Sequence, residues 1–433
     1  MLATAGFLTI FVLLALIISK KTSALMALTV VPVVAALVCG FGWQINGFIS
    51  TGMKNIAPIA AMFIFAILYF SILYDTGMFD PIIRGIIRFA KGNPVGIVMG
   101  TFVLAICSHF DGSAASTYLI TISAMLPLYE RLKLDRRVLA CCAAMGAGIM
   151  NMVPWGGPTL RAASSLKLDL SELYTPVIPA QIVGMLFMLG ISWWLGRREA
   201  RRIGYTAGDV AAMDLEQVLT DEERELRRPK LFWFNVTLTA VTIALLVSSK
   251  LAPAVCFLFA LIVLVAVNYP KVAFQQERMN AHAKSALLMA TVLFSAGAFI
   301  GIMQGTGFLK AMALAGASTI PQEMAHHIPF ITGIFSMPLS LIFDPDSFYF
   351  GVLPVIAETA SALGVPALQV GQAAILGQMT VGCSLSPLTP SFFLLIGLAG
   401  VDIGEHQRFT LPFAWATSIL MTFVCVIMGL FPL

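Results

Sequence analysis

The sequence predicts an all-α polytopic membrane protein made of two inverted repeats, each with five transmembrane helices and one re-entrant hairpin. Three observations lead to this prediction: the composition, the spacing of the apolar runs, and a shared order of interruptions in both halves. Of the 433 residues, 59% are hydrophobic and 11% are charged. Soluble domains carry about 25% charged residues, so most of this chain must be surrounded by lipid or by other apolar helices.

Apolar runs extend along nearly the whole chain and divide into two similar sets. In the first half we expect spanning helices over residues 2–18, 23–39, 57–73, 138–160 and 177–195, and a hairpin over about 95–129. In the second half we expect them over 232–248, 252–267, 286–303, 370–395 and 411–430, with a hairpin over about 329–360. Amphipathic stretches at 79–91 (with Arg84 and Arg88) and 307–317 follow the third helix of each set. The first run is interpreted as a helix rather than a signal peptide, because Lys20 and Lys21 follow it.

A charged segment separates the two sets and defines the predicted domain organisation. Residues 1–196 form the first repeat, 197–230 a cytoplasmic linker, and 231–433 the second repeat. At an offset of 230 residues Thr76 and Gly77 match Thr306 and Gly307, and at 233 Pro154 falls on Pro387 and Asp169 on Asp402. The identities are few, but their near-constant offset predicts an ancient duplication.

The basic residues support the inverted arrangement. If each hairpin enters and leaves on one side, each half crosses the membrane five times, and the second half is inverted. With both termini outside, 21 of the 26 Lys and Arg residues lie on inner segments, and Lys54, Lys167, Lys250 and Lys310 lie outside. This bias agrees with the positive-inside rule. Arg161 is left over within an apolar stretch.

Four polar breaks interrupt the apolar runs, and the first is the tip of the first hairpin, residues 109–117. Lipid cannot hydrogen-bond exposed backbone, so such breaks survive only where protein or a water-filled cavity satisfies them. Gly112 permits a tight reversal, while Ser113, Ser116 and Thr117 can cap the returning helix or bind an anion at its N-terminus. Asp111 must be protonated, paired or bound to a cation at this depth, or else serve as a helix cap.

The second break, residues 151–161, holds two prolines and two glycines and cannot remain helical. Gly156 and Gly157 are expected to expose backbone N–H groups to a ligand. Arg161 suits a carboxylate because its guanidinium is planar and bidentate, although a snorkelling or helix-tethering arginine is the alternative. Asn151 and Thr159 complete the expected binding residues of this break.

The other two breaks are in the second half. At 343–348, Asp344 and Asp346 flank a proline ahead of Ser347, and this oxygen-rich tip suits protons, Na⁺ or Mg²⁺, or forms only a structural turn. At 384–391, three hydroxyl residues either face a ligand or satisfy freed carbonyl groups. These residues are Ser386, Thr389 and Ser391.

Together the breaks predict a transporter for a small anion. Asp111, Asp344 and Asp346 would handle protons or cations, and Asp111 and Asp346 would contact a metal if a metal complex is carried. The remaining break residues would hold substrate carboxylates. A cation/proton antiporter on the same architecture, a channel and a membrane enzyme are the alternatives; the sequence contains no nucleotide-binding loop, zinc spacing or nucleophile elbow. We expect no resident cofactor and no nucleic-acid partner.

Several motifs resemble the citrate–metal:proton symporter family, within the ion transporter superfamily. They include PWGGPT at 154–159, LSPLTP at 385–390 and GEHQRF at 404–409, and the resemblance covers nearly the whole chain. It implies proton-coupled uptake of citrate in the bacterial inner membrane, often as a complex with a divalent metal such as Mg²⁺. It also implies a homodimer in which a transport domain carrying both hairpins moves like an elevator against a scaffold.

The chain departs from that family at one place. Metal–citrate members resemble a first tip with two acids, whereas residues 111–117 here read DGSAAST and contain only Asp111. A metal-free di- or tricarboxylate, or a sodium-coupled dicarboxylate carrier on the same fold, therefore stays open.

Overall fold

The structure is a computed structural model that describes residues 1–19, 21–81, 85, 93–205, 221–247 and 251–433. Within these ranges the regular elements are helices and no strand is present, as the sequence predicts. Six helical stretches of the described chain are long and apolar enough to cross a membrane, judged by length and composition. They are Gln44–Asp75, Pro94–Asp111, Leu170–Arg202, Arg224–Leu246, Ala286–Gly305 and Ile403–Ile427. The amphipathic stretch at 79–91, including Arg84 and Arg88, lies largely outside the described residues.

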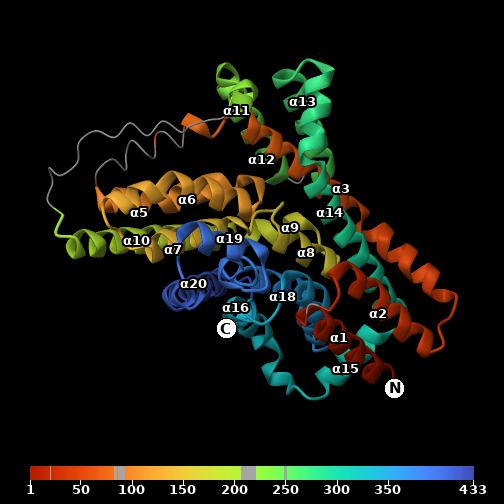
Figure 1. Ribbon diagram of the computed structural model, residues 1–433. Coiled ribbons are helices and arrows are strands. Elements are labelled where there is room, and N and C mark those ends of the chain that lie inside the picture. Colours follow the sequence, from red (N-terminus) through yellow and green to blue (C-terminus); the bar gives the residue numbers. More distant parts are fainter. Residues whose placement is uncertain (20, 82–84, 86–92, 206–220, 248–250) are drawn as a thin grey trace.

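The helices follow the predicted order (Figure 1). Those of the first half are α1 Leu2–Ile18, α2 Ala24–Val38, α3 Gln44–Asp75, α5 Pro94–Ser108, α6 Ala114–Arg131, α7 Arg136–Met150, α8 Gly157–Leu166, α9 Leu170–Tyr174 and α10 Ile178–Arg202. Those that follow are α11 Asp221–Leu226, α12 Phe232–Val247, α13 Pro253–Asn268, α14 Val272–Gly305, α15 Phe308–Ala317, α16 Ile328–Leu339, α17 Leu353–Ala362, α18 Ala367–Ile375, α19 Pro390–Ala399 and α20 Ile403–Ile427.

Three helices extend further than predicted, because the predicted bounds followed the apolar runs and each of these helices continues into polar residues. α3 begins at Gln44 rather than at residue 57, and its polar Lys54 and Asn55 remain exposed. α14 begins at Val272, fourteen residues before the predicted start. α10 continues to Arg202, so the first residues of the predicted linker are helical. The predicted interruptions between α7 and α8 and between α18 and α19 are confirmed.

The long helices α3 and α14 form an antiparallel pair. Phe48 near the start of α3 lies against Gly301 and Gly305 near the end of α14, whereas Asp75 at the end of α3 contacts Arg278 near the start of α14. A Cβ atom on Gly301 would lie only 2.2 Å from the carbonyl oxygen of Phe48. Small residues therefore allow the two backbones to approach closely.

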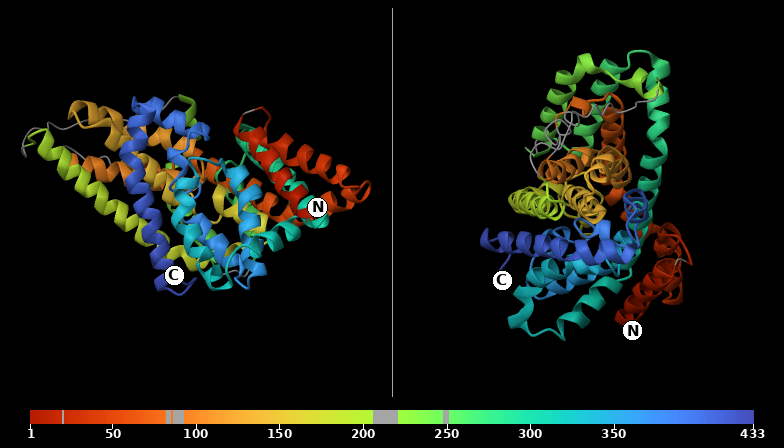
Figure 2. Two further views of the ribbon diagram at one scale, coloured as in Figure 1. Left: turned by 90° about the horizontal axis from the view of Figure 1, so that it is seen from below. Right: turned by 60° about the vertical axis from the view of Figure 1, so that its left-hand side comes forward.

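The helices gather into two groups (Figures 1 and 2). In one group α3 and α14 pack together and are joined by α1, α2, α13 and α15. In the other, α5, α6, α7 and α10 pack with α16, α18, α19 and α20. Each group takes helices from both halves of the sequence. α8 contacts α3 and α14 as well as α18, so it lies where the two groups meet.

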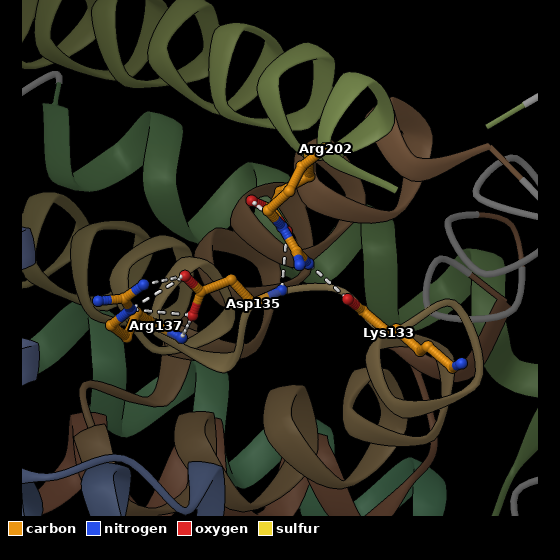
Figure 3. Close-up of polar contacts among 5 residues, drawn as sticks. Lys133, Asp135, Arg137 and Arg202 are labelled. Carbon is orange, nitrogen blue, oxygen red and sulfur yellow. Dashed lines mark hydrogen bonds and ion pairs between the residues drawn. The ribbon is translucent and has the colours of Figure 1, made fainter. Parts of the chain in front are cut away.

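A polar cluster ties the end of α10 to the turn between α6 and α7 (Figure 3). Arg202 forms an ion pair with Glu199 at 2.7 Å and donates to the carbonyl oxygen of Lys133 at 2.5 Å. Glu199 accepts from the backbone N–H of Asp135, whose carboxylate pairs with Arg137 at 2.7 Å. Although burial raises it, hydrogen bonds from Arg137 hold the pKa of Asp135 below its usual range. The cluster therefore joins the end of α10 to the turn that leads into α7.

Candidate functional site

A cavity of about 490 Å³ lies where the two helix groups meet, within the size range of small-molecule sites. One side, which we name the helix wall, is formed by continuous helices. Its residues are Phe63, Ile67, Ser71 and Tyr74 of α3 and His282 and Met289 of α14. The other side, the break wall, consists of residues from the four polar breaks and is described below. In the structure the fourth break extends from the end of α18 to the start of α19, so it includes Met379 and Cys383.

The first hairpin tip presents its acid to the cavity. After α5, a short 3₁₀ turn ends at Asp111, and Gly112 reverses the chain with a φ of 71°. Ser113 then caps α6 by accepting a hydrogen bond from the N–H of Ser116. The Asp111 carboxylate accepts from the Ser113 N–H at 2.9 Å and from the Ser116 hydroxyl at 2.5 Å. Asp111, Ser113 and Ser116 all line the cavity, so Asp111 both stabilises the turn and faces a ligand space.

Behind this tip, one chain of hydrogen bonds connects three of the breaks. His109 contacts the Thr117 hydroxyl through Nδ1 at 2.8 Å and the Asn151 side-chain oxygen through Nε2 at 3.5 Å. Asn151 donates to the carbonyl oxygen of Met379 at 2.7 Å, and both residues line the cavity. Thr117 is fully buried in this network rather than at the cavity surface, because its hydroxyl also donates to Ser113 O.

The second break uses its glycines in two different ways. The Gly156 N–H donates to the Val153 carbonyl at 2.7 Å, so it closes the turn instead of facing a ligand as the sequence suggested. Gly157 lines the cavity, and a Cβ atom there would lie 2.8 Å from Nη1 of Arg161. Glycine at 157 therefore leaves room for the guanidinium. The Thr159 hydroxyl is buried and donates to the freed Met152 carbonyl.

Arg161 projects from α8 into the cavity and carries an internal counter-ion. Its Nε donates to Oδ1 of Asp346 at 2.8 Å, and its Nη2 lies 3.9 Å from the sulfur of Met289. The side chain is only 8% exposed, so it does not snorkel to a membrane surface. A buried cation without a partner would cost several kcal/mol, and Asp346 supplies that partner.

At the second hairpin tip the two acids have separate contacts. Neither acid lines the cavity. Asp346 contacts Arg161, which does line it, whereas Asp344 accepts from the Ser347 N–H at 3.2 Å. Pro345 is the residue of this tip that lines the cavity. The Ser347 hydroxyl is buried and has no hydrogen-bond partner within the described part of the chain. A π-helical turn, Ser347–Val352, follows and leads into α17.

The fourth break contributes hydroxyl groups and one strained residue. Thr389 and Ser391 line the cavity, although the Thr389 hydroxyl also lies 3.0 Å from the Cys383 carbonyl. Ser386 lies behind them, fully buried, where its side chain accepts from the Leu388 N–H. Met379 adopts a positive φ of 51°, and Asn151 holds its carbonyl group. This break thus satisfies its own backbone and still offers hydroxyls to the cavity.

Sequence reasoning did not find the helix wall. Phe63, Ile67, Ser71 and Tyr74 recur at helical spacing along one face of α3, which is the pattern of any packed helix. His282 lies in the polar part of α14, ahead of the apolar run that defined the predicted helix. Only knowledge of which face borders the cavity would have identified these residues.

Broken helices enclose a cavity that is lined by charged and hydroxyl side chains as well as apolar ones. They lie inside a bundle of helices long and apolar enough to cross a membrane, and this arrangement is typical of a membrane transporter. Comparison with known proteins gives the family. The family described as "Citrate transporter" matches residues 10–377. The chain is 47% identical to the "Citrate transporter" of Bacillus subtilis (strain 168) and 42% identical to that organism's "Mg(2+)/citrate complex secondary transporter", over 99% of every chain compared. This protein belongs to the citrate transporter family, which confirms the resemblance seen in its sequence motifs.

Two solved structures share the fold. The YdaH transporter of Alcanivorax borkumensis aligns with a TM-score of 0.60 and 16% identity, over 90% of this chain and 91% of that one. MtrF of Neisseria gonorrhoeae, described as illuminating a class of antimetabolite efflux pumps, aligns with a TM-score of 0.55 and 14% identity, over 90% and 85%. At such identities the likeness concerns the fold alone, and it agrees with a multi-pass membrane protein.

Proposed function

We propose that this protein is a secondary transporter that imports citrate or a related di- or tricarboxylate, with protons as the coupling ion. The Arg161–Asp346 ion pair at the cavity carries this proposal. A guanidinium with one edge on an internal carboxylate and the rest beside a cavity can receive a substrate carboxylate. The names of the two Bacillus subtilis relatives support citrate as that substrate.

The ion pair suggests how substrate and coupling ion are linked. A substrate carboxylate beside Arg161 brings a second negative charge close to Asp346, and Asp344 adds a third nearby. Repulsion among them favours uptake of a proton or a cation at the second tip, and linkage requires that this ion in turn favours substrate binding. Asp344 and Asp346 are therefore proposed coupling residues.

Asp111 faces the same cavity from the first tip and is the third proposed coupling residue. No group of three or more His, Cys, Asp or Glu side chains that could hold a metal occurs among the described residues. A divalent ion such as Mg²⁺ would thus take many of its oxygen ligands from the substrate and water. It would enter as cargo, with Asp111 or Asp346 as a protein contact.

The binding residues follow from the cavity. We propose that Arg161, Asn151 and the Gly157 backbone hold substrate carboxylates together with hydroxyl groups of the tips and breaks. The cavity-lining hydroxyls are Ser113, Ser116, Thr389 and Ser391. Thr117, Gly156, Thr159, Ser347 and Ser386 would act from behind, because none of them lines the cavity.

We further propose that the chain is two inverted repeats in which one helix group moves against the other like an elevator. The turns that end α3 and α14 support this, since Gly77 and Gly307 adopt φ values of 73° and 75° after Thr76 and Thr306. Asp169 and Asp402, also related by the offset, both cap helices. The cytoplasmic linker, the outward termini, the homodimer and the bacterial inner membrane belong to the same proposal.

Uptake by proteoliposomes tests the proposed function. Purified protein is reconstituted and offered labelled citrate, succinate and malate, each with and without Mg²⁺, under an inward proton gradient or an inward Na⁺ gradient. We expect saturable citrate uptake that the proton gradient drives. Driving by Na⁺ alone would indicate a sodium-coupled carrier, and proton-linked cation flux without carboxylate uptake would indicate an antiporter.

A further inference from the structure

His282 lines the cavity from the helix wall, opposite the polar breaks, and has no role in the binding site described above. Its Nε2 lies 2.8 Å from Oδ2 of Asp75, and its side chain is 24% exposed. Its neighbours on this wall, such as Ile67 and Met289, are mostly apolar. His282 is thus the residue of the helix wall that can carry a positive charge.

The contact with Asp75 fixes the histidine ring. Asp75 is the last residue of α3, where the negative end of the helix disfavours an acid, so its carboxylate needs cationic partners. Arg278, one turn before His282 on α14, supplies a second contact to the same oxygen at 3.3 Å. With Nε2 bound to Asp75, Nδ1 is the ring atom left for a ligand, and it has no partner within the described ranges.

The charges of the break wall do not neutralise every carboxylate of a substrate that carries several. Arg161 supplies the positive charge of the break wall, but Asp346 already occupies its Nε. A tricarboxylate spanning the cavity needs a second donor for the carboxylate that points away from Arg161. The helix wall offers His282 for this role, and Ser71 and Tyr74 line the same wall.

We propose that His282, in its protonated form, binds a second carboxylate of the substrate that Arg161 does not hold, and that Asp75 is its positioning residue. This inference rests on the proposed function. When Nε2–H is donated to Asp75, Nδ1 can donate to a carboxylate only if the ring carries both protons. Substrate binding at His282 therefore requires both ring protons, is favoured at low pH and weakens as the pH rises.

Charged and titratable groups from every neighbouring element act on this ring. Asp75 from α3 and Asp111 from the first tip bring negative charge near the ring, and Arg278 of its own helix brings positive charge. The groups facing the ring or its partner are Tyr74, Asp75, Asp111, Arg161, Arg227, Glu277 and Arg278.

The test compares citrate affinities of wild type, His282→Gln and Arg278→Gln, measured by calorimetry in one detergent without Mg²⁺. At pH 6 we expect the His282→Gln variant to bind citrate about tenfold more weakly than wild type, the loss expected for a charged hydrogen bond. At pH 8 we expect a clearly smaller ratio, because the proposed contact needs a ring that carries both protons. Taking the ratio of variant to wild-type affinity at each pH cancels the titration of citrate itself. In the His282→Gln variant, the affinity for succinate should fall less than the affinity for citrate.

Arg278→Gln is the matched control, because Arg278 binds the same Asp75 oxygen but does not line the cavity. Removing this cation favours the protonated ring, so the variant should keep the weakening of citrate binding as the pH rises and should bind citrate no more weakly than wild type at low pH. A His282→Gln ratio that is the same at both pH values, or an Arg278→Gln variant that reproduces it, would overturn the inference. If wild type binds no carboxylate at either pH, the result contradicts the proposed function itself rather than the role of His282 alone. His282→Asn replaces the glutamine variant if that protein is not monodisperse.

Discussion

At the first hairpin tip the acid is held by its own hairpin, whereas at the second tip an acid reaches across to the other half of the chain. Asp111 accepts hydrogen bonds from Ser113 and Ser116 of the same turn. Asp346 instead forms an ion pair with Arg161 of α8, 185 residues away in sequence. A ligand can therefore meet Asp111 without disturbing an ion pair, but at Arg161 it shares the guanidinium with Asp346.

The helices that carry the two tips also differ in whether they pack within their own hairpin or against other elements. α5 and α6 pack against each other, so the first tip closes a compact hairpin. α16 packs mainly against α18 and α20, and α17 mainly against α15 and α18, so the second tip joins elements of both helix groups. A substitution at the second tip thus acts more directly on the contacts between the two helix groups. We expect substitutions there to have larger effects than those at the first tip.

Removing Arg161 should have the largest effect. Arg161→Ala should weaken citrate binding by about 100-fold or more and abolish uptake, because truncating a buried charge partner costs roughly 2–5 kcal/mol. Binding is measured by calorimetry and uptake in proteoliposomes. The Arg161→Ala/Asp346→Asn double variant controls for the orphaned acid, and it should recover stability but not uptake. Normal citrate transport by Arg161→Ala would remove the arginine from the binding site.

Asp346→Asn should separate binding from coupling. The amide keeps the shape of the carboxylate and an oxygen for Arg161 Nε, but it can no longer exchange a proton or bind a cation strongly. We expect citrate affinity within about threefold of wild type, near the effect of one weakened hydrogen bond, and loss of accumulation against a gradient. The accumulation ratio under an imposed proton gradient is the measurement. Accumulation equal to that of wild type would exclude Asp346 as a coupling residue.

Much of the break wall could be located from sequence, because proline, glycine and polar residues inside apolar runs mark places that lipid cannot satisfy. Asp111, Asn151 and Arg161 lie at the cavity for that reason. The breaks do not show which hydroxyls turn inward. Thr159 and Ser386 satisfy backbone groups of their own turns, and a serine or threonine that does so has the same sequence context as one that faces a ligand.

The helix wall shows a different limit. α14 continues for fourteen residues ahead of the apolar run that begins at 286, and these residues include His282. Hydropathy locates the lipid-facing part of a helix, not its ends. A histidine in a polar helical segment therefore looks like a surface residue until its packing against Asp75 of α3 is known. The roles assigned to these cavity residues stay predictions.

The smallest effect is expected at the first tip, where Asp111→Asn changes charge but not shape. The side-chain oxygen can still accept from the Ser113 N–H and the amide can donate to the Ser116 hydroxyl, so the turn should fold normally. We expect citrate uptake to fall by less than about tenfold, the effect of one charged hydrogen bond, with a flatter dependence on pH. Initial rates in proteoliposomes from about pH 5.5 to 8 provide the measurement. Ser116→Ala is the matched control, since it removes the 2.5 Å contact and keeps the charge, and it should retain the wild-type pH profile. An Asp111→Asn profile parallel to wild type would show that the acid of the first tip only caps its helix, and would leave proton coupling to the second tip.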